Sequence, residues 1–280
     1  MIALGTTHAR SIPRTQGDVD WTMFPIRDDN PHFLTPFVTY GLIAANVLAW
    51  VLLQGLGSEP ALSSSVCRLG LIPGELLQTA QAGARFPVGP DSVCVIGDMR
   101  SWYTPLTSMF MHGGWFHLLG NMWFLWIFGN NVEDSMGHAR FVVFYLLCGI
   151  SAAALQVVAD PSSVIPMVGA SGAIGGVMGA YVLLYPRVHV HMLIVLGFYV
   201  TTIAVPAIFM LGYWFVVQVI SGWTSIGAEG GGVAFWAHVG GFVAGALLVL
   251  LFRNPRLLER HPYHGWSRRS PTQSWHKTRR

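Results

Sequence analysis

The chain has 280 residues, of which 52% are hydrophobic and only 10% are charged, and its formal net charge at pH 7 is +3. Ordinary soluble domains carry roughly 25% charged residues. The length would suit one or two soluble domains, but the low charge and the long apolar runs exclude a soluble globular protein. They predict a membrane protein that crosses the bilayer several times.

Residues 1–36 are polar, with several prolines, the basic residues Arg10, Arg14 and Arg27, and no apolar core. A cleavable signal peptide needs a short hydrophobic stretch soon after a basic start, and this segment has none. We therefore expect a polar, poorly ordered cytoplasmic segment ahead of a membrane domain that occupies residues 37–252.

A bilayer core about 30 Å thick requires roughly 20 apolar residues of helix. Six stretches qualify: residues 37–56, 115–128 with an upstream extension from Leu106, 141–158, 168–185, 206–220 and 234–252. A further apolar stretch, residues 192–205, is short, is broken by Gly197 and is closed by Pro206. It is either a seventh span or an interfacial segment that leads into the helix beginning at Pro206.

The distribution of charge favours six spans. With both termini in the cytoplasm, all but three of the 16 basic residues fall inside, the exceptions being Arg68, Arg85 and Arg100. This bias follows the positive-inside rule. A seventh span would move the basic tail, residues 253–280, to the outside, so we predict an all-α bundle of six transmembrane helices.

Four polar residues then meet at one depth of the membrane. The second, fourth and sixth spans all begin on the outer side, and they carry His117 and Asn121, then Ser171, then His238 near their starts. Because a helix rises about 1.5 Å per residue, these side chains lie at similar shallow depths. Ionisable residues inside a span indicate a functional site.

Two glycine faces would bring Ser171 and His238 together. Gly175 and Gly179 follow Ser171 at helical spacing, and Gly241 and Gly245 follow His238 in the same way. Small residues at this spacing let membrane helices approach closely. A serine within hydrogen-bond reach of an imidazole is an activated nucleophile. Each half of this pattern is equally compatible with a purely structural packing surface.

His117 and Asn121 are four residues apart and share a helix face. Donors of this kind stabilise the negative charge that develops on a carbonyl oxygen during acyl transfer, although they could instead hold two helices together. We expect His112 to shape the helix entry. His112, His117 and His238 could also hold zinc, but there is no His-Glu-x-x-His sequence, and we expect neither a metal nor another cofactor.

The predicted spans contain no carboxylate. That excludes an aspartyl intramembrane protease and leaves no Asp to orient His238, so the expected catalytic unit is a Ser–His dyad, one of the variants of the serine triad.

Three ordered motifs resemble those of the rhomboid intramembrane serine proteases of the six-span bacterial type. They are His117-Leu-Leu-Gly-Asn121, Gly169-Ala-Ser171-Gly172, and Ala237-His238 with the glycines that follow. The resemblance implies hydrolysis of peptide bonds in or next to transmembrane helices through an acyl-enzyme on Ser171. It further implies that His238 is the base and that His117 and Asn121 stabilise the oxyanion.

The sequence departs from the family pattern at two places. Gly175 occupies a position where some members carry an aromatic residue that stacks on the histidine, and Ser101-Trp102-Tyr103-Thr104 lacks the arginine of a frequent Trp-Arg pair. These differences concern the orientation of the histidine and the geometry of the loop, and they leave the nucleophile and the base in place.

The segments outside the spans leave several questions open. The long first outer loop, residues 57–105, packs against or dips into the membrane, and its Cys67 and Cys94 either form a disulfide or remain free. Cys148 is expected to be a packing residue. The linker 227–232 either lets the fifth span tilt or is a plain surface turn, and the basic tail is expected to lie on anionic lipid without binding nucleic acid.

The sequence thus predicts a multi-pass serine endopeptidase of the plasma membrane, whose partners are transmembrane protein substrates and the bilayer. Two alternatives remain: a catalytically silent relative that binds membrane clients, and a transporter, since broken helices with polar groups also mark transport sites.

Overall fold

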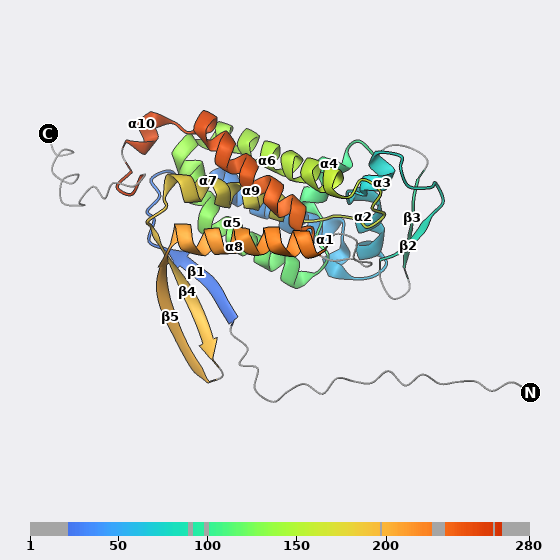
Figure 1. Cartoon of the computed structure of the whole chain (residues 1–280), viewed down its shortest axis with the longest axis horizontal. Helices are drawn as coiled ribbons and strands as arrows, with labels where there is room; N and C mark the ends of the chain where they lie inside the picture. Colours follow the sequence, from blue (N-terminus) through green and yellow to red (C-terminus); the bar gives the residue numbers. More distant parts are fainter. Residues whose placement is uncertain are drawn as a thin grey trace, which may run out of the picture.

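A computed structural model describes residues 22–88, 92–97, 101–196, 198–225, 233–259 and 261–264. Within these ranges, the longest helices form a bundle in which they lie side by side (Figure 1). Each corresponds to one of the six predicted stretches: α1 (Phe37–Leu52), α5 (Trp115–Met136), α6 (His138–Ala159), α7 (Ser171–Leu184), α8 (Ala207–Thr224) and α9 (Phe235–Phe252).

The helices of the bundle differ in length and polarity. Among the described residues, α6, α8 and α9 are long and apolar enough to cross a membrane, and α1 and α7 are shorter apolar helices. Helix α5 runs past residue 128 to Met136 and carries Glu133 and Asp134 in its last turns. The helix is therefore longer than the predicted stretch 115–128.

The predicted extension of the second span from Leu106 was wrong. Residues in this region form two short separate turns, α4 (Thr104–Thr107) and η2 (Ser108–Phe110), and α5 begins only at Trp115. Two glycines, Gly113 and Gly114, stand directly before that start, and glycine readily adopts the non-helical backbone needed to break a helix.

Residues 192–205 form no helix, so they are not a seventh helical span, whereas the interfacial alternative stays a prediction. They belong to a β-hairpin of β4 (His189–Leu196) and β5 (Tyr199–Pro206), paired from His189↔Pro206 to Leu196↔Tyr199. Strand β1 (Thr22–Asp28) pairs antiparallel with β4 and completes a sheet of order β1-β4-β5. The segment is rich in Val, Ile and Thr, which favour strands. Because β1 lies within residues 1–36, the expected lack of order there was wrong for residues 22–28; residues 1–21 lie outside the described ranges.

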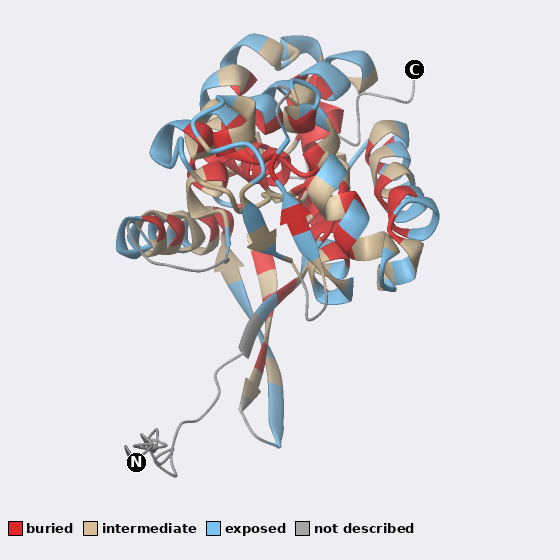
Figure 2. Ribbon diagram, turned by 90° about the vertical axis from the view of Figure 1, so that its right-hand side faces the viewer, coloured by how far each residue is buried: buried red, intermediate tan, exposed pale blue. Residues whose placement is uncertain are grey.

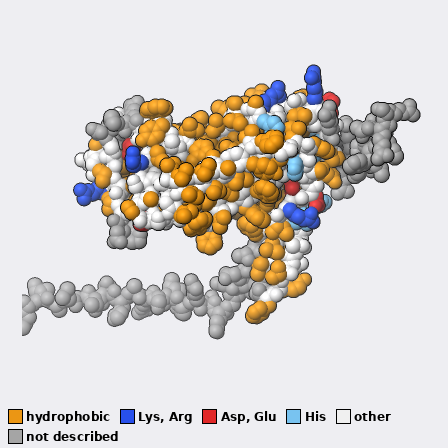
Figure 3. Space-filling model, turned by 180° about the vertical axis from the view of Figure 1, so that it is seen from behind, with side chains coloured by type: hydrophobic (Ala, Val, Ile, Leu, Met, Phe, Trp, Pro, Cys, Tyr) orange, Lys and Arg blue, Asp and Glu red, His pale blue; other side chains and the backbone are white. Residues whose placement is uncertain are grey.

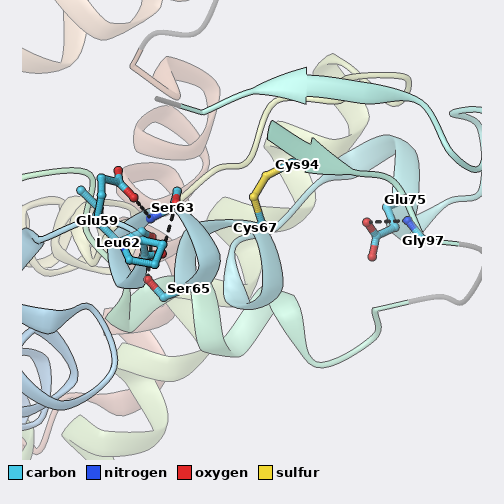
Figure 4. Close-up of a disulfide and its surroundings, with 9 residues drawn as sticks. Glu59, Leu62, Ser63, Ser65, Cys67, Glu75, Cys94 and Gly97 are labelled. Carbon is cyan, nitrogen blue, oxygen red and sulfur yellow. Dashed lines mark hydrogen bonds between the residues drawn. A yellow bond between two sulfur atoms is a disulfide. The ribbon is translucent and has the colours of Figure 1, made fainter. Parts of the chain in front are cut away.

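The two ends of the bundle carry different substructures. The sheet and α10 (Pro255–Leu258) lie at one end, and the connection between α1 and α5 lies at the other (Figure 1). This connection contains η1 (Gly55–Gly57), α2 (Ala61–Leu69), α3 (Pro73–Leu76), β2 (Arg85–Pro87) and β3 (Val93–Val95). A disulfide between Cys67 and Cys94 joins α2 to β3 (Figure 4), which answers the open question about these cysteines.

Buried residues concentrate where the helices of the bundle face one another (Figure 2), and Cys148 of α6 is among them, as expected for a packing residue. On the face of the bundle that Figure 3 shows, hydrophobic side chains cover the middle and charged side chains gather towards the two ends. This distribution is the inverse of a soluble protein's surface and suits contact with lipid.

Helices α7 and α9 touch through their glycines, as the sequence predicts. A Cβ atom built on Gly241 would lie 1.8 Å from the carbonyl oxygen of Gly172, and one built on Gly245 would lie 1.9 Å from that of Gly176. No side chain fits at either position without moving the helices apart. This contact brings the first turns of α7 and α9 together.

Two buried carboxylates at the end of α5 hold the start of α1. Glu133 accepts hydrogen bonds from the backbone N–H groups of Val38 (3.0 Å) and Thr39 (2.8 Å), and Asp134 accepts one from the N–H of Phe33 (3.0 Å). The first N–H groups of a helix have no acceptor within the helix, and negative charge near them is favourable. The two carboxylates therefore fix α1 against α5 at the end of the bundle that carries the sheet.

Candidate active site

Ser171 and His238 form a hydrogen-bonded pair. The Oγ of Ser171, the first residue of α7, lies 2.7 Å from Nε2 of His238, which is in the first turn of α9. The glycine contact between the two helices sets this distance, because a larger residue at Gly241 or Gly245 would hold the helix starts apart. The geometry is that of a hydroxyl positioned to transfer its proton to an imidazole.

A third residue, Gln218 of α8, completes the surroundings of the imidazole. Its Oε1 lies 2.8 Å from Nδ1 of His238, and its side chain is buried. An amide oxygen only accepts hydrogen bonds, so Nδ1 carries the proton and Nε2 is left with a free lone pair towards Ser171. Gln218 was not predicted as a site residue. The available signal was the presence of an amide within the apolar stretch 206–220.

The aromatic neighbour of His238 also comes from α8. The ring of Trp214 lies 5.7 Å from the imidazole, centroid to centroid, with an interplanar angle of 37°. At Gly175, the position where some family members carry an aromatic residue, a Cβ would lie 3.1 Å from the backbone oxygen of His238, so a side chain there would require a small shift of α9. One helix, α8, thus supplies both the hydrogen-bond acceptor and the aromatic surface.

His117 lies next to the pair. A Cβ built on Gly169, whose φ is +124°, would lie 2.7 Å from Nε2 of His117 and 3.5 Å from Oγ of Ser171. The absence of a side chain at Gly169 therefore lets the imidazole of His117 approach the serine. Nδ1 of His117 accepts a hydrogen bond from the N–H of Gly113 (3.3 Å), which leaves Nε2 to face the site.

Asn121 is buried one turn further along α5, and its Nδ2 has no hydrogen-bond partner among the described residues. His112 is fully buried before α5; its main-chain N–H donates to Oε1 of Gln54 (2.8 Å), and its carbonyl accepts from Nε2 of Gln54 (2.7 Å). These main-chain bonds fix the loop that enters α5, whereas the role of the His112 side chain stays a prediction.

A cavity of about 420 Å³ opens onto the pair. Ser171, His238 and His117 line it, whereas Asn121 is not among its lining residues. Its walls otherwise consist largely of small or apolar residues from η2, α6, α9 and the loop before α7, such as Met109, Ala152, Met167 and Ala237. Its volume is in the range of ligand-binding pockets, so it can admit part of a peptide chain. Within the described part of the chain, no three His, Cys, Asp or Glu side chains are grouped as metal ligands.

Comparison with known proteins places this site in context. The model of the Rhomboid domain matches residues 99–255, which include His117, Ser171 and His238. Relatives include Rhomboid-like protein 11, chloroplastic, of Arabidopsis thaliana, which is 35% identical over 34% of this chain and 34% of its own length. Rhomboid protease GluP of Bacillus subtilis is 35% identical over 53% of this chain and 26% of its own length.

Rhomboid-like protease 5 of Toxoplasma gondii is 34% identical over 50% of this chain and 15% of its own length. The matched regions therefore span about a third or less of these three relatives. The match to the domain model covers more than half of the present chain, and the chain belongs to the rhomboid family.

Proposed function

We propose that this protein is an intramembrane serine endopeptidase that hydrolyses peptide bonds in or next to the transmembrane helices of other proteins. The observation that carries the proposal is the 2.7 Å contact between Oγ of Ser171 and Nε2 of His238 at a cavity inside an apolar helix bundle. Two of the relatives are named rhomboid proteases, which supports the same class of reaction.

In the proposed orientation, the six helices cross the plasma membrane and the end that carries the sheet faces the cytoplasm, together with both termini. Arg27, Arg140 and Arg253 at that end support this orientation through the positive-inside rule. The Cys67–Cys94 disulfide at the other end gives independent support, since disulfides persist in oxidising compartments. The site then opens towards the outer half of the bilayer.

In the first chemical step, Oγ of Ser171 attacks the carbonyl carbon of the scissile bond while Nε2 of His238 accepts the hydroxyl proton. The tetrahedral intermediate collapses when the C–N bond breaks, and the imidazolium gives its proton to the departing amine. An acyl-enzyme on Ser171 remains. Water, deprotonated by the same imidazole, then attacks the ester, and the proton returns to Oγ.

The negative charge of the tetrahedral intermediate needs hydrogen-bond donors near the carbonyl oxygen. The backbone N–H of Ser171 is available, because the first N–H groups of a helix have no acceptor within it. His117 lines the cavity beside Ser171 and supplies a second donor. The unpaired Nδ2 of Asn121 supplies a third when a substrate chain enters. No step of this reaction requires a cofactor.

The proposal is tested by cleavage of a reporter transmembrane substrate by purified protein in vesicles, with the variants Ser171→Ala and His238→Ala. Both should lose the product band and keep the thermal stability of the wild type. Ser108→Ala is the matched control, because Ser108 also lines the cavity but its Oγ contacts the carbonyl oxygen of Pro105 (3.5 Å) and not His238; it should cleave normally.

A fluorophosphonate probe gives a second readout that does not depend on the choice of substrate. It should label the wild type and Ser108→Ala but not Ser171→Ala. Cleavage by Ser171→Ala would refute the mechanism. Absence of both cleavage and labelling in the wild type would favour a catalytically silent client-binding protein.

A further inference from the structure

The β4–β5 hairpin has a tip that is unlike that of a hairpin in water. Phe198, in the turn between the strands, is fully exposed, and the next two residues, Tyr199 and Val200, are 65% and 60% exposed. No Asp, Glu, Lys or Arg occurs anywhere in residues 188–228. Edge strands of soluble proteins are commonly protected by charged residues, above all Lys, and this hairpin has no such protection.

Both faces of the hairpin are mainly apolar in its outer half, where Thr201 and Thr202 are the polar exceptions. Directly paired residues in an antiparallel sheet point to the same face, so Ile194 and Thr201 share one face and Val195 and Val200 share the other. A sheet with one wet face alternates apolar and polar residues. The outer half of this hairpin lacks that alternation, which indicates an apolar environment on both sides.

The hairpin is fixed to the bundle at its base. Phe24 of β1 packs on Trp123 of α5 with 5.7 Å between ring centroids, and Nε1 of Trp123 donates a hydrogen bond to the carbonyl oxygen of Pro25 (2.7 Å). On the β4 side, Nε2 of His191 contacts Asp29 at 2.8 Å. These contacts set the direction of the strands relative to the helices.

That direction is across the bundle. The strands run transverse to the long axis of the helices and project sideways from their end, and the second view agrees (Figures 1 and 2). If the helices cross a bilayer, a hairpin in this direction extends along the membrane surface and does not point away from it. Strand β5 also continues directly into α8, whose exposed face carries Phe209, Tyr213 and Val216.

We infer that the tip of the β4–β5 hairpin is embedded in the lipid interface beside α8, with Phe198, Tyr199 and Val200 in contact with acyl chains and headgroups. Aromatic side chains such as Tyr favour this layer of the membrane. The apolar surface of α8 and that of the hairpin then form one continuous lipid-facing surface. In the proposed orientation, the hairpin lies on the inner leaflet. Its contact with lipid is expected whether or not the protein is a protease.

The test uses the full-length protein in phosphatidylcholine vesicles, with an environment-sensitive fluorophore on Phe198→Cys. The other cysteines are a disulfide pair and the buried Cys148, so the wild type serves as the labelling blank. Ala82→Cys, in an exposed turn at the opposite end, is the matched control. The label at position 198 should emit at shorter wavelength and should lose several-fold more fluorescence in vesicles with brominated acyl chains.

Three outcomes would overturn the inference. Equal quenching of both labels by aqueous iodide, with no effect of bromine, would show that the tip lies in water. Disulfide cross-linking between two molecules of the unlabelled Phe198→Cys variant would identify a second copy of the chain as the partner. A blue shift that appears only when substrate is added would indicate that β5 pairs with a substrate strand.

Discussion

The hydrogen bond between Gln218 and His238 offers a direct test of how the base is held. Gln218→Met keeps the length and most of the volume of the side chain but removes the acceptor that lies 2.8 Å from Nδ1. A buried N–H left without a partner costs about 1–3 kcal/mol. Since about 1.4 kcal/mol corresponds to a tenfold change in rate, we expect kcat to fall roughly 10- to 100-fold.

The assay is steady-state cleavage of the reporter substrate, with kcat and KM determined separately. The loss should appear in kcat with little change in KM, because Gln218 contacts the base and does not line the cavity. Gln218→Glu retains an acceptor and should recover most of the activity. Val216→Met, on the exposed face of α8, is the matched control. Wild-type kcat in Gln218→Met, with normal thermal stability, would refute the positioning role.

Three further predictions concern stability. Gly245→Ala should destabilise the protein by about 1–3 kcal/mol through overpacking and lower its melting temperature in detergent, whereas Gly212→Ala, where a Cβ meets nothing within 4 Å, should not. Burial raises the pKa of Asp28 from 3.8 to about 6, so the folded state binds this proton more tightly than the unfolded state. The free energy of unfolding should therefore fall as the pH rises from about 4 to about 6, and Asp28→Asn should flatten this part of the curve in a pH series of thermal unfolding. Reduction of the disulfide between Cys67 and Cys94, which are separated by 27 residues, should destabilise the connection between α1 and α5 by up to about 3.5 kcal/mol in the chain-entropy model. Faster limited proteolysis should report this loss, and Cys67→Ser should reproduce it without reductant.

Much of the candidate site could be predicted because its determinants are local. Ser171 and His238 each stand directly ahead of glycines at helical spacing, and close helix packing follows from that spacing. Gln218 could not be assigned in the same way. The partner of a single amide in an apolar helix can be named only when the rotation of α8 about its axis relative to α9 is known. The spacing of residues within α8 does not determine that rotation.

The errors in the predicted fold have a common physical origin. Hydropathy identifies apolar chain but does not distinguish a helix from a strand, so it did not predict that residues 192–205 form a β-hairpin. Helix α5 likewise continues past the predicted stretch 115–128 and carries Glu133 and Asp134 in its last turns. Their carboxylate oxygens accept hydrogen bonds from backbone N–H groups about a hundred residues earlier in the chain. Sequence periodicity does not reveal partners that far apart.

Helix α8 has a consequence for when the protein can react. It is the least buried of the three long apolar helices, because only 22% of its residues are buried. It nevertheless supplies both Gln218 and Trp214 to His238. Any outward displacement of α8 removes both contacts and frees the imidazole to rotate and change tautomer. In the proposed mechanism, His238 is therefore held for proton transfer only while α8 packs against α9.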